Sequence, residues 1–341
     1  MYYCAPLKKS HQKDWEKLIT TNPAVGFQQS FEWANFKKLE DWIPHHIGLF
    51  DQKNTLKGGA LILQYKFPNN TNFLYIPQGP ILNYQKEDEL FWQWRSLEIA
   101  IHKLISQSKN NLTTHLRIEP RTHKIPEWFL STFVKAPLNL MPKHTQILNL
   151  KDTHDNILAQ MKPKGRYNIK LAIKNNVKIK QIKNPKSKDI EIFYNLYKHT
   201  FQRNKFHGKK ITFFQNFLKA CKNISHIFVA ENQKNTLAAA IILYYGKTAT
   251  YLYGASSNNN RQLMAPYLLH WEIIKDAKSR KFTQYDFWGV NSSSKDKKHT
   301  WHGLSQFKKK FGGEQFNFIG SHDFVIQKDL YQNFLKRHEI N

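Results

Sequence analysis

A faint internal repeat places the strongest constraint on what this chain can fold into. The apolar run Gly59–Tyr65 is echoed 180 positions later by Ala239–Tyr245, and polar residues end each run. Each is followed by a second short apolar run with the character of a strand, Phe73–Ile76 in the first copy and Thr250–Tyr253 in the second. Since a domain averages roughly 150 residues, this spacing favours two copies of one unit over a single large sheet.

In each copy, a loop, an amphipathic helix and a closing strand come next. The helices are predicted over Glu89–Ser106 and Met264–Ser279, and the closing strands over His115–Ile118 and Gln284–Trp288. This order of strands and helices predicts the α/β (α+β) class, arranged as two tandem domains.

The junction between the copies is predicted near residue 146. Pro137–Lys143 is typical of a connector, and Ile147–Leu150 begins a new strand, so the second domain starts at residue 147. A last helix is predicted over Lys328–His338, and we expect it to pack back on the first domain.

Three helices are predicted after this junction. Asp155 is expected to cap the first, and Pro163 with Gly165 is expected to end it before a second helix over 166–175. A third helix follows Pro185, where apolar side chains recur at helical spacing.

The composition is unusual in its large positive net charge. The chain has 52 Lys and Arg against 25 Asp and Glu, which gives a formal charge of +27. Such an excess favours a polyanionic partner, such as nucleic acid, nucleotide phosphates or an anionic membrane face. Scattered lysine in a chain rich in Asn and Ile also fits an AT-rich genome, so the basic patches have to be found individually.

Cysteine usage and hydropathy predict the compartment. Two cysteines, Cys4 and Cys221, exclude a disulfide framework and a thiolate metal cage. The longest apolar run, Leu237–Tyr245, has nine residues, where a membrane span needs about 20. Lysines interrupt the N-terminal segment before an apolar leader could form. We therefore expect a cytoplasmic protein.

The common nucleotide and metal motifs are not met. Gly246-Lys-Thr248 resembles the end of a phosphate-binding loop, but Ile241 stands where its first glycine belongs. Gly312-Gly313 lacks the third glycine of a dinucleotide fingerprint and fits a turn after a helix. The histidines lack ligand partners at metal spacing, and no pattern indicates a nucleophile. We expect no metal and no covalent enzyme intermediate.

A basic stripe is the strongest local charge pattern. Lys162 and Lys164 precede Arg166, Lys170 and Lys174, which recur at every fourth position of a predicted helix. Like charges at this spacing destabilise a helix by about 0.2 to 0.5 kcal/mol per pair, and an acidic partner would relieve that cost. A solvated lysine face is the alternative.

A strand with two tyrosines is a second candidate site. In Thr250–Ser257, alternation places Tyr251 and Tyr253 on one side, before a turn of small polar residues. The two phenols could line a binding surface or belong to the core.

Several sequence blocks together resemble a known family, the FemABX peptidoglycan-bridge aminoacyltransferases. The blocks of the second half are Tyr251–Ser257, Arg261–Leu269, Tyr285–Val290 and Gly303–Gly313. Those further upstream are Gln29–Lys37, Tyr75–Pro80, Leu116–Pro120 and Lys162–Lys174. Their order and spacing match the family over about residues 27–325.

The resemblance implies two tandem domains of the GNAT acetyltransferase fold. The first would comprise residues 1–146 and be completed by the C-terminal segment 318–341, and the second would comprise 147–317. No sustained heptad repeat is present, so the chain resembles the compact members without a coiled-coil arm.

The resemblance also implies an activity and its partners. Such enzymes transfer an amino acid from aminoacyl-tRNA to an amine of the peptidoglycan stem peptide, on a UDP-linked or lipid-linked precursor. Both substrates are polyanionic, which suits the charge of this chain. No further cofactor is expected. A peripheral contact with the inner membrane face is expected.

Three alternatives stay open. Acetyl-CoA transfer on the same fold is disfavoured, because the turn over 257–266 contains no glycine for a pyrophosphate. The amino acid could go to a non-peptidoglycan acceptor. A non-catalytic tRNA-binding or RNA-binding protein would also explain the charge.

Residue by residue, the resemblance implies a catalytic group. Lys308, beside Phe307, would contact the reacting carbonyl and stabilise its developing negative charge. Glu119, at a position that is often Asp in the family, would orient the acceptor amine. Asp286 is expected to be structural, and Ser321 stands where a relative can carry an acid.

The remaining matches imply binding residues. Lys37 and Arg203 would hold the phosphates of the precursor, with Tyr251 and Tyr253 lining the site. The residues expected to contact tRNA or phosphate are Lys162, Lys164, Arg166 and Lys170.

Overall fold

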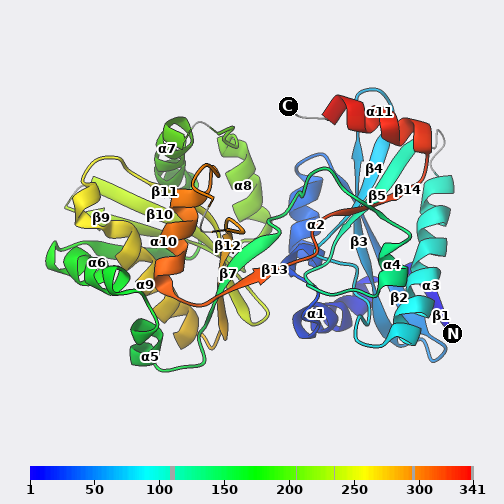
Figure 1. The fold of residues 1–341 in the computed structure, drawn as a ribbon, viewed down its shortest axis with the longest axis horizontal. Helices are drawn as coiled ribbons and strands as arrows, with labels where there is room; N and C mark the ends of the chain where they lie inside the picture. Colours follow the sequence, from blue (N-terminus) through cyan, green and yellow to red (C-terminus); the bar gives the residue numbers. More distant parts are fainter. Residues whose placement is uncertain (108–111, 205, 234, 294–295, 339–341) are drawn as a thin grey trace. The chain divides into compact units, whose positions relative to one another are not determined.

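The chain forms two compact units (Figure 1). The computed structural model describes residues 1–107, 112–204, 206–233, 235–293 and 296–338. Unit 1 comprises Met1–Lys143 and Asn317–Asn341, and unit 2 comprises His144–Phe316. The boundaries expected from the sequence, 146/147 and 317/318, lie three residues and one residue away from these.

Unit 1 contains a seven-stranded sheet in which only one neighbouring pair is parallel. The strand order is β1 (Tyr2–Pro6), β2 (Ile43–Asp51), β3 (Leu56–Lys66), β4 (Asn72–Pro77), β5 (Thr113–Glu119), β14 (His322–Val325) and β6 (Val134–Lys135). The parallel pair is β4 with β5, and the other pairs are antiparallel. Strand β14 comes from the C-terminal segment, so the chain returns to complete this sheet.

Unit 2 repeats this sheet. Its strand order is β8 (Lys178–Ile182), β9 (Ser225–Asn232), β10 (Asn235–Tyr245), β11 (Thr248–Ser256), β12 (Gln284–Gly289), β7 (His144–Asn149) and β13 (Glu314–Asn317). The parallel pair is β11 with β12. The predicted duplication is therefore confirmed. Strand β7, which begins unit 2, takes the place that the C-terminal β14 takes in unit 1.

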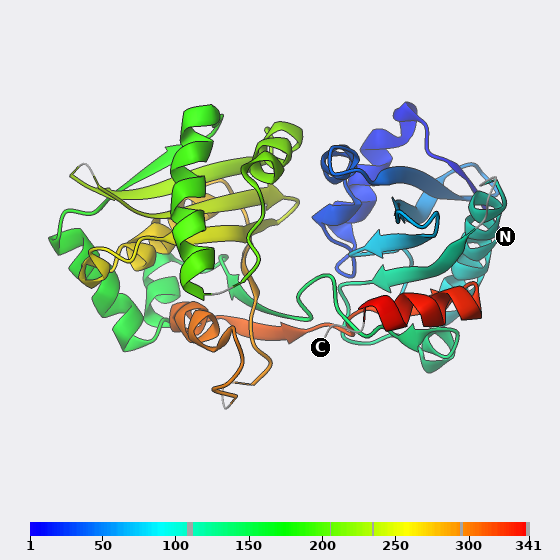
Figure 2. The same cartoon turned by 90° about the horizontal axis from the view of Figure 1, so that it is seen from above.

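Helices lie on both faces of the sheets (Figures 1 and 2). Those of unit 1 are α1 (Gln12–Thr21), α2 (Phe31–Lys38), α3 (Glu87–Ser106), α4 (Glu127–Leu130) and α11 (Lys328–His338). Those of unit 2 are α5 (His154–Ala159), α6 (Pro163–Lys174), α7 (Ser187–Asn204), α8 (Ile211–Ala220), α9 (Ala265–Ser279) and α10 (His302–Lys308). The predicted helix over Lys328–His338 is confirmed.

The two crossover helices, α3 and α9, connect the parallel strands and bury an apolar face. In α3 this face consists of Leu90, Trp94, Leu97, Ile101 and Ile105, at the spacing of an amphipathic helix. They pack on a core that includes strand residues such as Leu49 and Ile76.

Two local predictions in unit 2 are wrong. The side chain of Thr153, rather than Asp155, caps α5, because its Oγ1 accepts the N–H of Asn156 at 3.2 Å. The two helices predicted around Pro163 are present as α5 and α6, but Pro163 and Gly165 lie in the first turn of α6, where proline is tolerated, and not in the break before it. A Cβ at Gly165 would lie 2.7 Å from the carbonyl oxygen of Lys310, so the glycine permits a close backbone approach.

That approach brings two basic segments together. The 3₁₀ turn η4 (Lys309–Phe311) follows α10, and the Lys310 carbonyl oxygen accepts the Lys162 N–H at 3.0 Å. Gly312 and Gly313 then adopt φ of 82° and 77°, which confirms the predicted turn after a helix. Among the described residues, no helix is long and apolar enough to span a bilayer.

Candidate functional site

The parallel strands of unit 2 separate early. Strands β11 and β12 pair at Thr248–Gln284, Ala249–Tyr285 and Thr250–Asp286, and the register contains no later pair between them in these fully described strands. Beyond this point β11 remains paired with β10, but a bulge at Leu252 interrupts their register: Ile242 faces Tyr251, and Ile241 faces Tyr253. Bulges of this kind re-aim side chains.

The bulge places the two tyrosines on opposite faces of the sheet, so the prediction that they share one side is wrong. Tyr251 lies edge-on to His270 of α9, with ring centroids 4.5 Å apart. Tyr253 packs against Phe213 and Phe214 at the start of α8. The extra residue of the bulge reverses the period-two alternation on which the prediction relied.

Gly254 allows Tyr251 to lie along its own strand. A Cβ at this position would stand 1.6 Å from the Tyr251 hydroxyl oxygen. The phenol therefore occupies the space of a missing side chain.

Lys308 lies on the Tyr251 face and is buried. It is the last residue of α10, and 4% of it is exposed. Its Nζ donates to the carbonyl oxygen of Gly289 at 2.7 Å and stands 5.5 Å from the centroid of the Tyr251 ring. Burial lowers the pKa of Lys308 from 10.5 to about 7, and the charge of Asp286 opposes this shift.

The aromatic residues around Lys308 keep water away from it. Phe307 packs edge-on against Tyr267, with centroids 5.0 Å apart, and contacts His270 at 5.4 Å. Burial, assisted by the charge of Lys308, lowers the pKa of His270 to about 3, so this imidazole is neutral. Its Nδ1 lies 2.8 Å from the Tyr285 hydroxyl. An ammonium in such surroundings is poorly solvated and can act strongly on a nearby anion.

Arg203 lies at the far end of β11. Its guanidinium Nη1 donates to the Ser256 carbonyl at 3.1 Å, and its side chain remains largely accessible. Burial, and then the charge of Arg261, lower the pKa of Arg203. Two guanidinium groups that repel one another beside a polar turn favour an anionic ligand.

Four basic residues at α6, all expected to contact tRNA, divide into two kinds. The side chains of Lys162, Lys164 and Lys170 are exposed. Arg166 is half-buried instead, and its guanidinium donates to the carbonyl of Ala159, at 3.2 Å, and to that of Met161. It therefore binds carbonyl oxygens at the end of α5 and just after it. The predicted stripe of Arg166, Lys170 and Lys174 is thus not one uniformly exposed face.

Two further predicted residues belong to unit 1. The ammonium of Lys37 lies over the rings of Trp33, Phe36 and Trp42, at 5.6, 5.6 and 4.9 Å from their centroids. These contacts anchor the side chain of Lys37, in α2, among aromatic rings.

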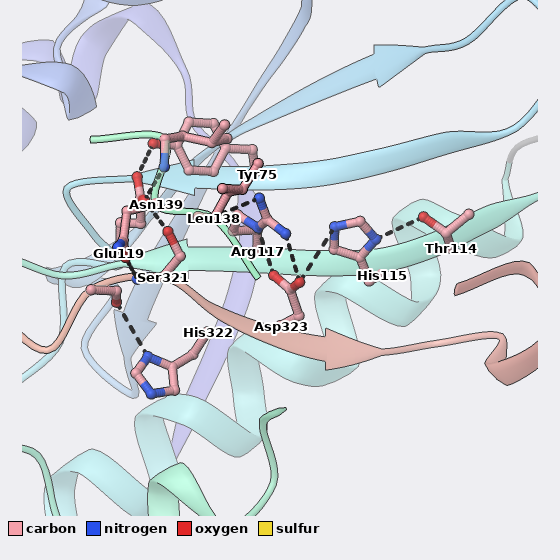
Figure 3. Close-up of polar contacts among 12 residues, drawn as sticks. Tyr75, Thr114, His115, Arg117, Glu119, Leu138, Asn139, Ser321, His322 and Asp323 are labelled. Atoms are coloured by element: carbon pink, nitrogen blue, oxygen red, sulfur yellow. Dashed lines mark hydrogen bonds and ion pairs between the residues drawn. The ribbon is translucent and has the colours of Figure 1, made fainter. Parts of the chain in front are cut away.

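Glu119 stands at the end of β5 within a dense hydrogen-bond network (Figure 3). Its Oε1 accepts from the Ser321 hydroxyl and from the N–H groups of Leu140, at 2.7 Å, and Met141, at 3.2 Å. Its Oε2 accepts from the Tyr75 hydroxyl. Burial raises the pKa of Glu119, although these donors oppose the shift.

A neighbouring ion pair was missed from the sequence. The Nε and Nη2 of Arg117 donate to the two carboxylate oxygens of Asp323, each at 2.7 Å, and the Tyr331 hydroxyl donates to Oδ2 at 2.9 Å. Both partners are buried, and they join β5 to β14 (Figure 3). The available signal was the position of Arg117 inside the predicted strand His115–Ile118, between two apolar neighbours.

The structure therefore distributes the predicted residues over both units. Lys308, Phe307 and Tyr251 gather on one face of the unit 2 sheet, and the guanidinium of Arg203, from α7, reaches Ser256 at the end of the strand that carries Tyr251. Lys37 and Glu119 belong to unit 1. Among the described residues, no three His, Cys, Asp or Glu side chains gather in a way that could hold a metal ion.

Comparison with known proteins assigns this architecture to a family. The sequence model of the FemAB family matches residues 11–124, 127–235 and 228–336, and the chain belongs to this family. It is 22% identical to the lipid II:glycine glycyltransferase of Staphylococcus epidermidis over 394 aligned positions, covering 93% of this chain and 92% of the relative. The chain is an enzyme of the aminoacyltransferase class.

Solved structures share the fold. The crystal structure of FemX has a TM-score of 0.81 at 18% identity, covering 99% of this chain and 100% of that one. A tandem GNAT protein from the clavulanic acid biosynthesis pathway has a TM-score of 0.56 at 9% identity, covering 95% and 98%. The predicted pair of GNAT-like domains is confirmed.

Proposed function

We propose that this enzyme transfers an amino acid from aminoacyl-tRNA to an amine on the stem peptide of a peptidoglycan precursor. The observation that carries the proposal is the buried Lys308, held beside Tyr251 where β11 and β12 separate. The name of the relative from Staphylococcus epidermidis, a lipid II:glycine glycyltransferase, supports this acceptor and favours a lipid-linked precursor over a UDP-linked one.

The chemistry requires little covalent assistance from the protein. The acceptor amine attacks the ester carbonyl, the new C–N bond forms, the C–O bond to the tRNA breaks, and the amine proton ends on the released 3′-terminal hydroxyl. Lys308 stabilises the oxyanion of the tetrahedral intermediate, which is worth about 3 to 4 kcal/mol for one preorganised donor. The aromatic surroundings exclude water that would hydrolyse the ester.

Lys308 and the acceptor amine must be in opposite protonation states. Transfer needs a protonated Lys308 and a neutral amine, whose ordinary pKa is about 10.4 if it is a lysine side chain. Below the pKa of Lys308, the rate falls about tenfold per pH unit, because the neutral amine becomes scarcer. Between the two pKa values the losses and gains cancel, so the rate is independent of pH.

Charged groups outside this centre bind the substrates' phosphates in the proposal. Arg203, with Arg261, binds a phosphate of the precursor. Lys37, in unit 1, is proposed separately as a phosphate-binding residue. Ser256, which Arg203 contacts, follows Tyr251 by five positions in β11. The phosphate site of the proposal is therefore roughly 16 Å of extended strand away from the reacting centre. Lys162, Lys164 and Lys170 bind the tRNA backbone. The aminoacyl-tRNA is the donor, and no further cofactor is proposed.

A transfer assay tests the proposal. Purified enzyme is mixed with a pool of aminoacyl-tRNAs and with either lipid-linked or UDP-linked stem peptide, and the precursor is weighed by mass spectrometry. A gain of one amino-acid residue supports the proposal and identifies the donor. Salt-sensitive tRNA binding without a gain on either precursor would contradict it and favour another acceptor or a non-catalytic role.

A further inference from the structure

Asp286 is a fully buried carboxylate close to Lys308 that the proposed chemistry does not yet use. It lies in β12 with 0% of its surface exposed. Its Oδ1 accepts the hydroxyl of Thr145, from the neighbouring strand β7, and the N–H of Trp288 at 2.8 Å. A buried carboxylate is costly unless hydrogen bonds or a cation stabilise it.

The Trp288 backbone is unusual at this point. Its φ is 62°, in the left-handed region that a residue with a Cβ rarely adopts. The register between β12 and β7 is interrupted here, because Asp286 faces Ile147 and Gly289 faces Thr145, so two residues of β12 stand opposite one of β7. The Trp288 N–H is the group that Asp286 holds, so the carboxylate stabilises the irregular turn.

This turn determines where Lys308 points. The residue that follows Trp288 is Gly289, and its carbonyl oxygen accepts the Nζ of Lys308 at 2.7 Å. The hydrogen bond holds the ammonium beside the Tyr251 ring. Asp286 thus acts on Lys308 in two ways, through the backbone of Trp288 and Gly289 and through its own negative charge.

We propose that Asp286 is a positioning residue for Lys308: its carboxylate fixes the turn whose Gly289 carbonyl oxygen holds the buried ammonium. This inference rests on the proposed function for its catalytic meaning. The other titratable groups that face Lys308 are Tyr251 of β11, which burial keeps neutral by raising its pKa, and the neutral His270 of α9. Behind His270 stands Tyr285, whose pKa burial also raises.

The direct test titrates Lys308 itself. Protein carrying ¹³C at the lysine ε carbons is titrated by NMR, and the Lys308 signal is identified by its loss in Lys308→Met. We expect Asp286→Asn, which keeps the shape but removes the charge, to lower the pKa of Lys308 by about one unit. Thr145→Val, which keeps the charge and removes one hydrogen bond, is the matched control and should leave the titration close to that of the wild type. An unchanged titration in Asp286→Asn overturns the inference, whether or not the enzyme transfers amino acids.

A kinetic measurement separates positioning from simple support of the fold. If the proposed chemistry holds, Asp286→Asn lowers the pH-independent rate above neutrality about tenfold, because fewer Lys308 side chains are protonated. At a pH about one unit below the shifted pKa, variant and wild type should transfer at similar rates. An equal loss at every pH would indicate structural damage and contradict the positioning role. Should Asp286→Asn fail to fold, Asp286→Ser, which also removes the charge, provides both measurements; the same shift is expected, and no shift would contradict the inference.

Discussion

The parallel strand pairs of the two units differ although their sheets have the same order. In unit 1, β4 and β5 pair from Asn72–Thr113 to Pro77–Glu119, at the ends of both strands, with one register shift after Asn72. In unit 2, β11 and β12 pair only from Thr248–Gln284 to Thr250–Asp286. The same scaffold therefore keeps one parallel pair closed and lets the other separate.

The buried carboxylates at the two parallel pairs, Glu119 in unit 1 and Asp286 in unit 2, also differ in their surroundings. Glu119 is surrounded by hydroxyl and backbone N–H donors, one of them from Ser321 in the returning C-terminal segment. Asp286 also accepts from neutral donors, Thr145 and Trp288, but its charge acts in addition on the buried ammonium of Lys308. Hydrogen bonds from neutral donors satisfy a buried carboxylate and stabilise the fold, whereas a buried cation is stabilised by further negative charge. We therefore assign the reacting carbonyl to unit 2 and the retention of the C-terminal segment to Glu119.

The largest expected effect comes from removing Lys308, the buried cation of unit 2. Lys308→Met should lower the single-turnover transfer rate by about 10³-fold, which is the scale of losing one oxyanion donor. The matched control is Lys309→Met, one residue along, which should stay within about twofold of wild type. Similar losses in both variants would contradict the role of Lys308.

The same substitution should stabilise the fold. Because burial lowers the pKa of Lys308 to about 7, the unfolded chain binds more protons between that pH and 10.5. The cost to the folded state is therefore fully present below pH 7 and disappears as the pH rises toward 10.5. We expect Lys308→Met to gain about 3 kcal/mol in unfolding free energy at pH 6, after losing one hydrogen bond, and less at pH 9. Urea denaturation at both values checks this.

Removal of the unit 1 carboxylate should act on stability instead. Glu119→Ala leaves the buried donors of Tyr75, Ser321 and two backbone N–H groups without their acceptor, and we expect a loss of about 3 kcal/mol in unfolding free energy. Glu127→Ala, an exposed carboxylate of the same unit, is the control. A stable Glu119→Ala enzyme with a 10³-fold lower rate would place catalysis in unit 1 and break the comparison.

Two of the arginines of unit 2, Arg203 and Arg166, sharpen the comparison between binding and structure. Arg203→Ala should raise KM for the precursor about tenfold with little change in stability, as expected for one phosphate contact. Arg166→Ala should instead reduce stability by about 1 kcal/mol, because it uncovers carbonyls at the end of α5. Precursor titrations and thermal melts of both variants check this, and a reversal of the two patterns would contradict the assignment.

The smallest effect concerns the space that Tyr251 occupies. In Gly254→Ala the new methyl group would meet the Tyr251 hydroxyl, so the ring must move away from its place beside Lys308. We expect about a fivefold lower transfer rate and a stability change below about 1 kcal/mol. Gly303→Ala is the control, because a Cβ there meets nothing within 4 Å. Equal rates in the two variants would mean that the ring position is unimportant.

Much of the fold could be predicted from the sequence because it depends on local periodicity. The repeated apolar runs, the helix over Lys328–His338 and the turn at Gly312-Gly313 follow from spacing and residue type. The opposite faces of Tyr251 and Tyr253 could not, because a bulge depends on the register with a neighbouring strand. The place of Gly165 inside a helix depends likewise on the approach of the Lys310 backbone.

In the candidate site as well, some features could be predicted from the sequence and others depend on tertiary packing. The resemblance indicated Lys308, but its burial and lowered pKa required the packing of β11, β12 and α9 around it. Arg166 belongs to a basic stripe in the sequence, and only the position of the α5 carbonyls shows what its guanidinium binds. Asp286 could be expected to be structural, yet its effect on Lys308 passes through the turn at Trp288, which no local pattern indicates.

The pH dependence of transfer by the wild-type enzyme tests the central claim most directly. Single-turnover rates are measured from about pH 5.5 to pH 9, with the spontaneous hydrolysis of the aminoacyl ester subtracted. We predict that the rate rises about tenfold per pH unit up to about pH 7, the pKa of Lys308, and is constant above it. A rise that continues without a bend to pH 9 would show that no buried lysine of near-neutral pKa takes part in the reaction.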